Sequence, residues 1–476
     1  MERRKLRVGL LGLGLEAYWA QFAGLRERLE SYVEVVSRKV SSPQREVVSL
    51  GLVDTPEKAV EAGHQCRRCD VDILLVYVTT YALSSTVLPV LQRARVPVIL
   101  LNLQPEAAID YARLNGMTSR TEMTGEWLAY CSACPMPEIT NVMRRLGMPF
   151  QQVTGMLHND PIAWQQLQQW LVACEIVVAL QHSRMGLMGH YYGGMLDIAT
   201  DLVQVSGRFG VHIEMLEVDE LSALRAEVSP VEIAASLEGV RAFFDVGEDC
   251  AKAEQERAAR TAVALERLVD RANLDMLAYY HKGSGNAANE ETMSSIILGT
   301  SMLTARGISV AGEYEVKNVI AMKILHLLGA GGSFTEYYAV DFAADLVLMG
   351  HDGPGHAAIA QDRIRVRPLQ VYHGKVGSGL SVEMSVQYGA VTLLSVVEHK
   401  EHGFQLLIAE GESVPGPILE IGNTNSRYRF SIGARRFMEE WNAHGPAHHC
   451  AIGTGHHAAT LIKLAHLLQI PSAQVC

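Results

Sequence analysis

The sequence predicts an α/β protein in which two Rossmann-like or flavodoxin-like α/β domains are followed by a C-terminal antiparallel β-barrel domain. Three observations lead to this prediction. The first third of the chain alternates short apolar runs with helical stretches, the middle third repeats this alternation, and the last third consists of short apolar runs between turn residues. Because a chain of 476 residues is too long for a single hydrophobic core, we expect several domains.

The first predicted domain covers residues 1–160. Four runs rich in aliphatic and β-branched residues have the length of buried strands: Leu6–Leu15, Val47–Leu52, Val71–Val78 and Val96–Leu103. Candidate helices lie between them: Tyr18–Val36, Thr55–Gly63 and Ala82–Arg95. This alternation is typical of an open parallel sheet with helices on both faces.

The second predicted domain covers residues 161–328 and begins with a helix from Asp160-Pro161 through Val177. Its candidate strands are Val211–Val218, Leu274–Tyr280 and Arg306–Val310, and its long candidate helices are Val231–Phe244 and Ala251–Asn273. The last of these helices has apolar residues at helical spacing opposite a charged face. We therefore expect a second α/β layer.

The third predicted domain covers residues 329–476 and has a different sequence pattern. Short runs recur between turn residues: Ile364–Val371, Leu380–Val386, Ala390–Val397, Phe404–Glu410 and Pro417–Ile421. Such a series indicates an antiparallel barrel or sandwich. Ala458–Leu468 is expected to close the chain as a helix.

Composition and charge argue against several classes of protein. The net charge of −11, with no long run of Lys and Arg, disfavours a nucleic-acid partner. The sequence has no signal peptide and no uncharged apolar stretch of about 18 residues, so we expect a soluble cytoplasmic protein with no membrane contact. Two CxxC pairs, at Cys66 and at Cys131, lie too far apart for the usual zinc-ribbon spacing, and reduced thiols are expected.

A Gly-x-Gly-x-x-Ala segment beginning at Gly12 resembles a dinucleotide-binding turn, with Glu34 as the acid that would bind a ribose. Glu34, however, lies in an apolar run that favours a helix. Trp19 and its bulky neighbours stand where a pyrophosphate would need open backbone. We interpret the segment as a tight βα turn in which Trp19 and Gln21 could face a ligand, and an NAD-dependent oxidoreductase is kept as an alternative.

Residues able to bind a metal gather where the chain passes from α/β to β. Glu313 follows a predicted strand, Glu336 comes from a Gly-rich turn, His351 ends an apolar strand, and two His-His pairs (448–449 and 456–457) precede the last helix. Two carboxylates and two imidazoles suit Mn²⁺ or Co²⁺ better than Ca²⁺. Such a metal can polarise a carbonyl while a nearby carboxylate moves a proton between carbons.

Ordinary interpretations of the same residues stand beside this one. A Glu after a strand is usually a solvated loop residue, and a His in a Gly-rich turn is usually satisfied by its own loop. Glu315 and Lys317 are expected to form an exposed helical face or a local ion pair. Spacing alone decides neither whether the four segments converge nor which C-terminal histidine takes part.

Four segments resemble the L-arabinose isomerase/L-fucose isomerase superfamily, in a divergent arabinose isomerase-like branch. Residues 312–317 resemble its Ala-Glu-Gly-Asp-Trp-Lys segment, and residues 332–337 resemble its Gly-Thr-Ser-Phe-Met-Glu-Asp segment. Residues 348–351 resemble its Leu-Gly-Ser-His strand end, and residues 441–450 resemble its Trp-x-x-x-Gly-Gly-Ala-His-His-Thr segment. The likeness covers nearly the whole chain and is strongest after Leu274.

The resemblance implies an aldose–ketose isomerase that converts an aldopentose, L-arabinose to L-ribulose first of all, through an enediol. It implies Mn²⁺, or Co²⁺ or Mg²⁺, held by Glu313, Glu336, His351 and His449, with the two glutamates transferring the proton. It also implies a homohexamer acting on a small sugar. An isomerase of the L-fucose or D-arabinose type and a non-catalytic sugar-binding relative are the alternatives.

Departures from the family leave the sugar open. The family's His-Gly-Gly-Arg-Glu segment, whose histidine is proposed to open the sugar ring, has its nearest match at residues 131–138, which contain no histidine. His456 and His457 form an unusual second pair, so either could replace His449. The candidate substrate-binding residues are Trp19, Gln21, His448, Asn423 and Arg427. The last two could equally cap a barrel turn.

Overall fold

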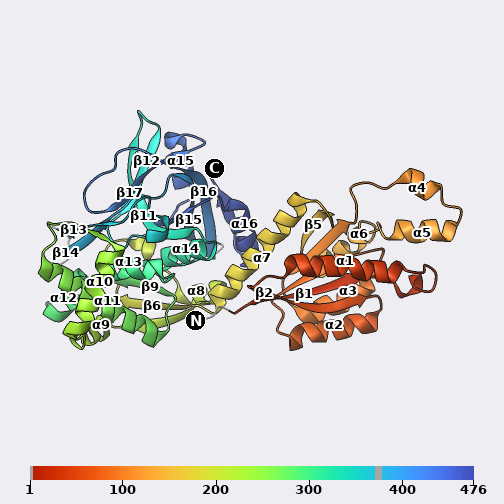
Figure 1. Cartoon of the computed structure of the whole chain (residues 1–476), viewed down its shortest axis with the longest axis horizontal. Helices are drawn as coiled ribbons and strands as arrows, with labels where there is room; N and C mark the ends of the chain where they lie inside the picture. Colours follow the sequence, from red (N-terminus) through yellow and green to blue (C-terminus); the bar gives the residue numbers. More distant parts are fainter. Residues whose placement is uncertain (1–3, 370–377, 402) are drawn as a thin grey trace. The chain divides into compact units, whose positions relative to one another are not determined.

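The computed structural model describes residues 4–369, 378–401 and 403–476. The chain divides into two compact units, Met1–Val178 and Ala179–Cys476 (Figure 1). Parallel α/β sheets precede a closed antiparallel barrel of six strands, which confirms the predicted fold class. The finer division at residues 1–160, 161–328 and 329–476 stays a prediction.

The first unit contains a parallel sheet of five strands in the order β2-β1-β3-β4-β5, the flavodoxin-like order. Its strands are β1 (Leu6–Leu13), β2 (Arg45–Val53), β3 (Ile73–Val78), β4 (Val98–Gln104) and β5 (Gln151–Met156). Its helices are η1 (Glu16–Tyr18), α1 (Leu25–Val40), α2 (Pro56–Arg68), α3 (Ser84–Ala94), α4 (Tyr111–Asn115), α5 (Arg120–Leu128), α6 (Met136–Arg145) and α7 (Pro161–Gln181), which ends just past the unit's last residue. Every residue of β3 is buried, because helices cover both faces of a parallel sheet.

The turn after β1 is filled by its own side chains. The helix expected at Tyr18–Val36 begins only at Leu25, because a short 3₁₀ turn and a loop come first. A Cβ on Gly14 would lie 2.7 Å from the ring of Trp19, and the indole N–H donates to Asp54 at 2.7 Å. Glu34 lies within α1, as expected. These positions support the interpretation as a tight βα turn.

The second unit begins with a parallel sheet of four strands in the order β10-β9-β6-β7. Its strands are β6 (Arg184–Gly189), β7 (His212–Leu216), β9 (Met276–Tyr280) and β10 (Ser309–Ala311). Its helices are η2 (Leu196–Ile198), α8 (Leu202–Phe209), α9 (Val218–Ala226), α10 (Pro230–Phe243), α11 (Lys252–Ala272), α12 (Ala287–Ser294), α13 (Ile297–Ala305) and α14 (Val316–Leu327). The carboxyl ends of β6, β9 and β10 lead into loops that begin at His190, His281 and Gly312.

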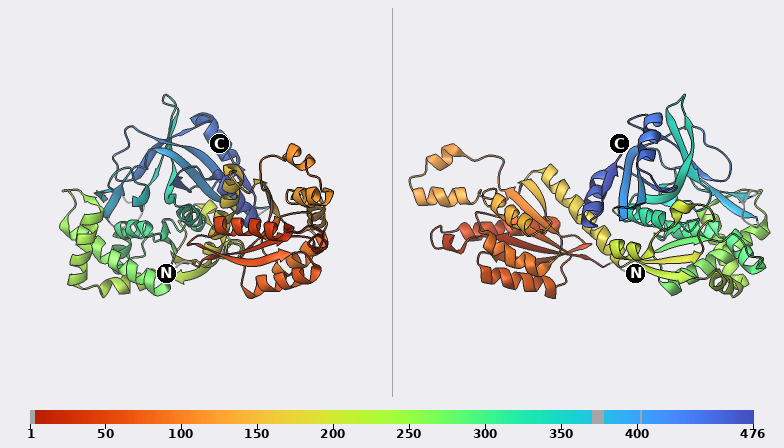
Figure 2. Two further views of the ribbon diagram at one scale, coloured as in Figure 1. Left: turned by 45° about the vertical axis from the view of Figure 1, so that its right-hand side comes forward. Right: turned by 180° about the vertical axis from the view of Figure 1, so that it is seen from behind.

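The barrel closes in the order β15-β18-β11-β12-β17-β16, with β16 returning to β15. Its strands, coloured cyan to blue in Figure 2, are β11 (Gly331–Asp341), β12 (Leu346–His351), β15 (Gly389–His399), β16 (Gly403–Val414), β17 (Thr424–Phe430) and β18 (Cys450–Thr454). The remaining elements are η3 (Ala357–Ile359), α15 (Ala434–Ala443), α16 (Ala458–Leu467) and β19 (Ser472–Gln474), which pairs with β16.

Three expectations about the barrel are wrong. The runs Ile364–Val371 and Leu380–Val386 do not enter it: β13 (Arg365–Leu369) pairs with β14 (Gly379–Glu383) and with β8 (Asp245–Val246) in a separate sheet, and the end of the first run lies outside the described residues. Pro417–Ile421 is not a strand, in keeping with a proline that offers no N–H for pairing. Glu336 lies within β11 and not in a Gly-rich turn.

Helix α14 joins the two layers of the second unit. It packs against β9 and β10 on one side and against β11, β15 and β18 of the barrel on the other. All ten residues from Val316 to Leu325 are buried, as expected of a helix enclosed on every side. The loop before α14, which carries Glu313, is therefore held between the sheet and the barrel.

Two further observations concern the described chain as a whole. Among the described residues, no helix combines the length and the apolar character needed to cross a membrane. All eight cysteines are described, and all are free thiols, with those of both CxxC pairs among them.

Candidate metal centre

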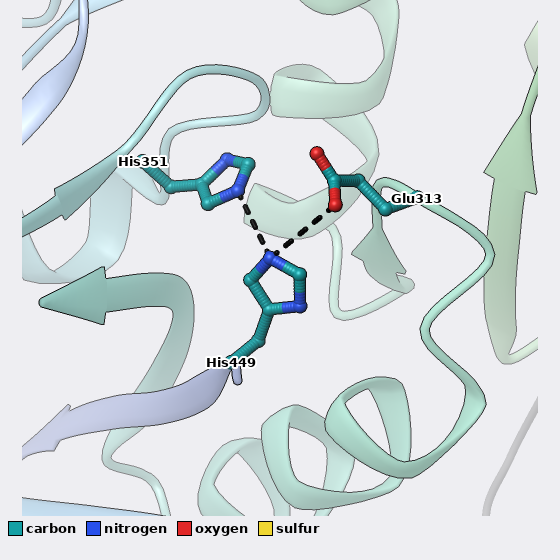
Figure 3. Close-up of side chains that lie close together, drawn as sticks. All are labelled: Glu313, His351 and His449. Atoms are coloured by element: carbon teal, nitrogen blue, oxygen red, sulfur yellow. Dashed lines mark hydrogen bonds and ion pairs between the residues drawn. The ribbon is translucent and has the colours of Figure 1, made fainter. Parts of the chain in front are cut away.

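Three side chains from three different elements meet at one point of the second unit (Figure 3). Glu313 comes from the loop between β10 and α14, His351 from the end of β12, and His449 from the residue before β18. The Nε2 atoms of the two histidines lie 3.2 Å apart, and Nε2 of His449 lies 3.6 Å from Oε2 of Glu313. Their donor atoms all fall within 4.8 Å of one another, so this group can hold a metal ion.

The backbone that presents Glu313 is in an uncommon conformation. Glu313 and Tyr314 have φ angles of 57° and 64°, a left-handed region that side chains other than glycine seldom adopt. The turn is held by the Tyr314 N–H, which donates to the Tyr279 carbonyl at 3.0 Å, and by the ring of Tyr191, whose centroid is 4.8 Å from that of Tyr314. Strain of this kind is concentrated at binding and catalytic sites.

The hydrogen-bond partners of the two histidines orient their rings. Nδ1 of His351 contacts the Asp352 carbonyl, and Nδ1 of His449 lies 3.4 Å from the Glu315 carboxylate. Both partners can only accept, so a proton on each Nδ1 would leave a lone pair on each Nε2. Two lone pairs and a carboxylate would repel one another unless a cation lay between them.

Burial favours the protonation state that a metal needs. His351 is 4% exposed and His449 is 1% exposed, and the ring of Phe334 packs against both imidazoles. Burial and the neighbouring His449 lower the pKa of His351, so its imidazole is neutral at pH 7. Only the neutral imidazole can bind a metal.

A buried ion pair lies next to His449, on the Nδ1 side of its ring. Glu315 and Lys317 are both almost fully buried, with Nζ and Oε1 3.4 Å apart. The expectation of an exposed face is wrong, and the alternative expectation of a local ion pair is confirmed. Lys317 also donates to the Asp197 carbonyl at 2.6 Å, and the Asp197 carboxylate accepts from the His448 N–H at 2.8 Å. This network fixes the backbone that carries both histidines of the pair.

Glu336 and His448 form a second group around His449. Nε2 of His448 lies 2.6 Å from Oε2 of Glu336, and donor atoms of these two residues and of His449 fall within 4.8 Å of one another. Burial raises the pKa of Glu336, but the hydrogen bond from His448 and the nearby histidines outweigh it and lower the pKa overall. The same hydrogen bond raises the pKa of His448. His449 thus links all four predicted ligands in one cluster.

The other predicted residues lie in several places. Asn423, next to β17, donates to the Tyr338 hydroxyl at 3.0 Å, whereas Arg427 donates to the Pro415 carbonyl at 3.2 Å. His456 and His457 contact the backbone carbonyls of Gly411 and Thr454 and belong to neither metal-binding group of the described residues.

The remaining two predicted residues, Trp19 and Gln21, lie in the first unit. The Gln21 amide donates to the Ala17 carbonyl at 2.7 Å, and Gln21 lines a cavity of about 590 Å³ between the loop before α1 and helix α5. Their binding of a sugar stays a prediction.

A small cavity of about 30 Å³ lies beside Glu313 and His351, roughly the volume of one water molecule. Other lining residues are Tyr279 and Tyr280 at the end of β9, His281 directly after it, Met293, Ile297, Asp352 and Leu369. The sequence analysis did not single out His281. It follows a correctly predicted strand directly, just as Glu313 follows β10, and that position at a strand's carboxyl end was the available signal.

Comparison with known proteins finds relatives among sugar isomerases. Residues 331–471 match the family described as L-arabinose isomerase C-terminal domain. An L-arabinose isomerase from Nocardioides sp. (strain ATCC BAA-499 / JS614) is 23% identical over 347 residues, which cover 69% of this chain and 67% of that protein. Sulfoquinovose isomerases from Priestia aryabhattai and Priestia megaterium (strain ATCC 12872 / QMB1551) are 20% identical over 407 residues, 84% of each chain.

Proposed function

We propose that this chain, which belongs to a divergent arabinose isomerase-like family, is a metal-dependent aldose–ketose isomerase. Sugar isomerisation is the class of activity that the relatives support. The finer assignment rests on one observation, the convergence of Glu313, His351 and His449, whose two Nε2 atoms lie close to each other and to the carboxylate. The first candidate reaction is the conversion of L-arabinose to L-ribulose.

In this proposal Glu313, Glu336, His351 and His449 hold the metal. A mixed set of carboxylates and imidazoles suits Mn²⁺, with Co²⁺ or Mg²⁺ as alternatives. The bound cation would polarise the sugar carbonyl and the neighbouring hydroxyl, which makes the proton on the carbon between them more acidic. Glu315 and the Asp352 carbonyl keep the two imidazoles in the tautomer that this binding requires.

The two ligand carboxylates also carry the proton in this proposal. One of them takes the proton from C2, and the electron pair left behind forms the C1=C2 bond of an enediolate with its negative charge on O1. The proton of O2 then passes to O1, C2=O2 forms, and the carboxyl group returns its proton to C1. Glu336 can act as the base, because its carboxylate is ionised at neutral pH and lies 2.6 Å from Nε2 of His448, which can share the proton.

A sulfonated hexose is the second candidate substrate. The sulfoquinovose isomerases match 84% of this chain, more than the 69% covered by the arabinose isomerase. A cationic group would have to bind the sulfonate, and Arg427 on β17 and Lys282 next to His281 are the residues to test for that role. The family resemblance further suggests a cytoplasmic homohexamer, which we include in the proposal.

The test is a sugar panel run with defined metals. The purified chain would be assayed for ketose formation from L-arabinose, L-fucose, D-arabinose and sulfoquinovose, first with Mn²⁺, Co²⁺ or Mg²⁺ and then after removal of metal with EDTA. Turnover of one sugar that is lost with EDTA and restored by metal supports the proposal. Sugar binding without ketose under all conditions would favour a non-catalytic relative, and tight binding of a nicotinamide cofactor would favour an oxidoreductase.

A further inference from the structure

The proposed reaction needs a step that the metal-binding carboxylates do not supply. Aldopentoses and aldohexoses exist in water almost entirely as cyclic hemiacetals, whereas the proton transfer between C1 and C2 needs an open-chain aldehyde. A group at the site must therefore take a proton from the anomeric hydroxyl and give one to the ring oxygen. This inference rests on the proposed function.

We propose that His281 is the acid–base residue that opens the sugar ring. It follows β9 directly and lines the cavity of about 30 Å³ together with Glu313 and His351. The imidazole therefore reaches the space beside the metal-binding group without belonging to that group. An imidazole both accepts and donates a proton near neutral pH, which suits a step that needs both.

The state of the His281 ring is the observation that singles it out. Its Nε2 atom is buried and has no hydrogen-bond partner in the described part of the chain. Among the described side chains that line the cavity, no other has a buried polar atom without a partner. Because buried polar atoms are nearly always hydrogen-bonded, an unpaired nitrogen on a residue that lines a cavity indicates a ligand that supplies the missing bond.

The surroundings of His281 keep its nitrogen available. The centroid of the His190 ring lies 6.4 Å away, and Nδ1 of His190 is occupied by the Tyr191 carbonyl at 2.9 Å. Burial, followed by the charge of His190, lowers the pKa of His281, so the ring is neutral at pH 7 with one lone pair and one N–H. A neutral imidazole can begin the step as a base.

His281 alone can accept and return the one proton that moves in the ring-opening step. Nε2 of His281 takes the proton of the anomeric hydroxyl, and the O1–H electron pair becomes the second bond of the C1=O1 carbonyl. The bond from C1 to the ring oxygen breaks and leaves its pair on that oxygen, which then takes the proton back from the imidazolium. Both oxygens are bonded to C1, so one nitrogen can serve each in turn, and His281 ends as it began.

The first test compares cyclic and open-chain substrates in the metal-loaded protein. For His281→Gln we expect kcat/KM to fall by about 10²–10⁴ on the cyclic aldose that the sugar panel identifies. On glyceraldehyde, which is too short to form a sugar ring of its own, the fall should be at least tenfold smaller. The matched control is His190→Gln, whose small effect should be equal on both substrates. Equal losses on both substrates for His281→Gln would overturn the proposal.

A second test measures ring opening by itself. Glu313→Gln stops proton transfer between carbons, yet it should still speed the exchange between the two anomers of the bound sugar, measured by NMR saturation transfer with metal present. Glu313→Gln/His281→Gln should lose that acceleration. Anomer exchange that is equally fast in both variants, or no faster than in buffer with Glu313→Gln alone, would overturn the role of His281. Failure of the wild-type chain to form any ketose would instead overturn the proposed function.

Discussion

The sheets of the two units share a strand order but differ in what stands at their carboxyl ends. Numbered within each sheet, the strands run second-first-third-fourth in both, as β2-β1-β3-β4 in the first unit, where β5 follows as a fifth strand, and as β7-β6-β9-β10 in the second. Open sheets of this kind place ligands outside the carboxyl ends of their strands. The same topology therefore offers two equivalent places for chemistry.

The polar side chains at the strand ends of the first sheet form hydrogen bonds with other groups of the same unit. Asp54, directly after β2, has a fully buried side chain that accepts from the Trp19 indole at 2.7 Å and from Lys58 at 2.6 Å. Thr79, directly after β3, donates to the Leu13 carbonyl at 2.6 Å. Because these side chains already have hydrogen-bond partners within the unit, we interpret their role as structural.

The strand ends of the second sheet are not satisfied in this way. The loop after β10 places Glu313 in a left-handed conformation that costs free energy, and His281 after β9 has a buried nitrogen without a partner among the described residues. The difference teaches that the fold supplies the position, whereas the side chains at the strand ends decide whether that position can bind a ligand.

The largest expected effect comes from a matched pair of acids, one at each sheet. Glu313→Gln should lower turnover about 10²–10⁴-fold, because it removes both a metal ligand and a proton-transfer group. Asp54→Asn should leave metal binding unchanged and lower the free energy of unfolding of the first unit by about 1–3 kcal/mol, because it weakens a buried hydrogen-bond acceptor. Ketose assays, Mn²⁺ titration and denaturant unfolding would separate the two. Loss of metal binding in Asp54→Asn would break the comparison.

The next effect distinguishes the two C-terminal His-His pairs. His449 belongs to both metal-binding groups, so His449→Ala should weaken Mn²⁺ binding more than about 100-fold. This loss is larger than the one usually caused by removing a residue that only hydrogen-bonds to a metal ligand. His457→Ala removes a ring that contacts the Thr454 carbonyl and should leave the affinity within a few-fold. Calorimetric titration of metal-free protein would measure both. Equal losses of Mn²⁺ affinity in the two variants would assign the fourth ligand position to the second His-His pair.

The buried ion pair behind His449 should have a smaller effect on the metal and a clear effect on stability. Glu315→Gln leaves Lys317 buried without its charged partner, which should cost about 3–5 kcal/mol of unfolding free energy in the second unit. It also weakens the acceptor at Nδ1 of His449, so Mn²⁺ affinity should fall about 10–100-fold. Glu315→Gln/Lys317→Met should recover much of the stability and none of the affinity. Recovery of both would contradict an orienting role for Glu315.

Strand-end residues were the part of the site that local sequence could predict. Arg306–Val310 was predicted as a strand and Leu346–His351 is an apolar run with a clear end, so the positions of Glu313 and His351 beside strands follow from their neighbours in the sequence. The short strand β6 was missed, because Arg184–Gly189 contains two glycines and the outermost of its six residues are not fully buried. Two predicted strands were wrongly assigned to the barrel, because the sheet that a strand joins depends on pairing between segments that are distant in the sequence.

The pairing of side chains could not be predicted, for the same reason. The hydrogen bond between Glu336 and His448 joins β11 to the residues before β18 and depends on the pairing of these two strands, which are far apart in the sequence. The burial of Glu315 and Lys317 depends on α14 being enclosed by sheet and barrel, whereas their sequence pattern suggested an exposed helical face. The family resemblance supplied the ligand set that spacing left open.

The smallest expected effect is a pH dependence of the Glu336–His448 pair in the metal-free protein. The raised pKa of His448 means that its stabilising contribution is complete below about pH 6.5 and is lost as the pH rises through the raised value. The lowered pKa of Glu336 means that its contribution is complete above about pH 4.3 and is lost as the pH falls through the lowered value. The pair therefore stabilises most between these limits, by less than about 1 kcal/mol because His448 is half-exposed.

Comparison with His448→Gln isolates this contribution from that of His351, whose lowered pKa acts in the opposite direction as the pH falls. Denaturant unfolding at pH 5.5 and pH 8.5 should show wild type more stable than His448→Gln at the lower pH, with the gap closing at the higher one. The first sheet offers the contrast, because the difference between wild type and Asp54→Asn should be the same at both values. A gap for His448→Gln that widens as the pH rises would mean that the imidazole is not the cationic partner of Glu336.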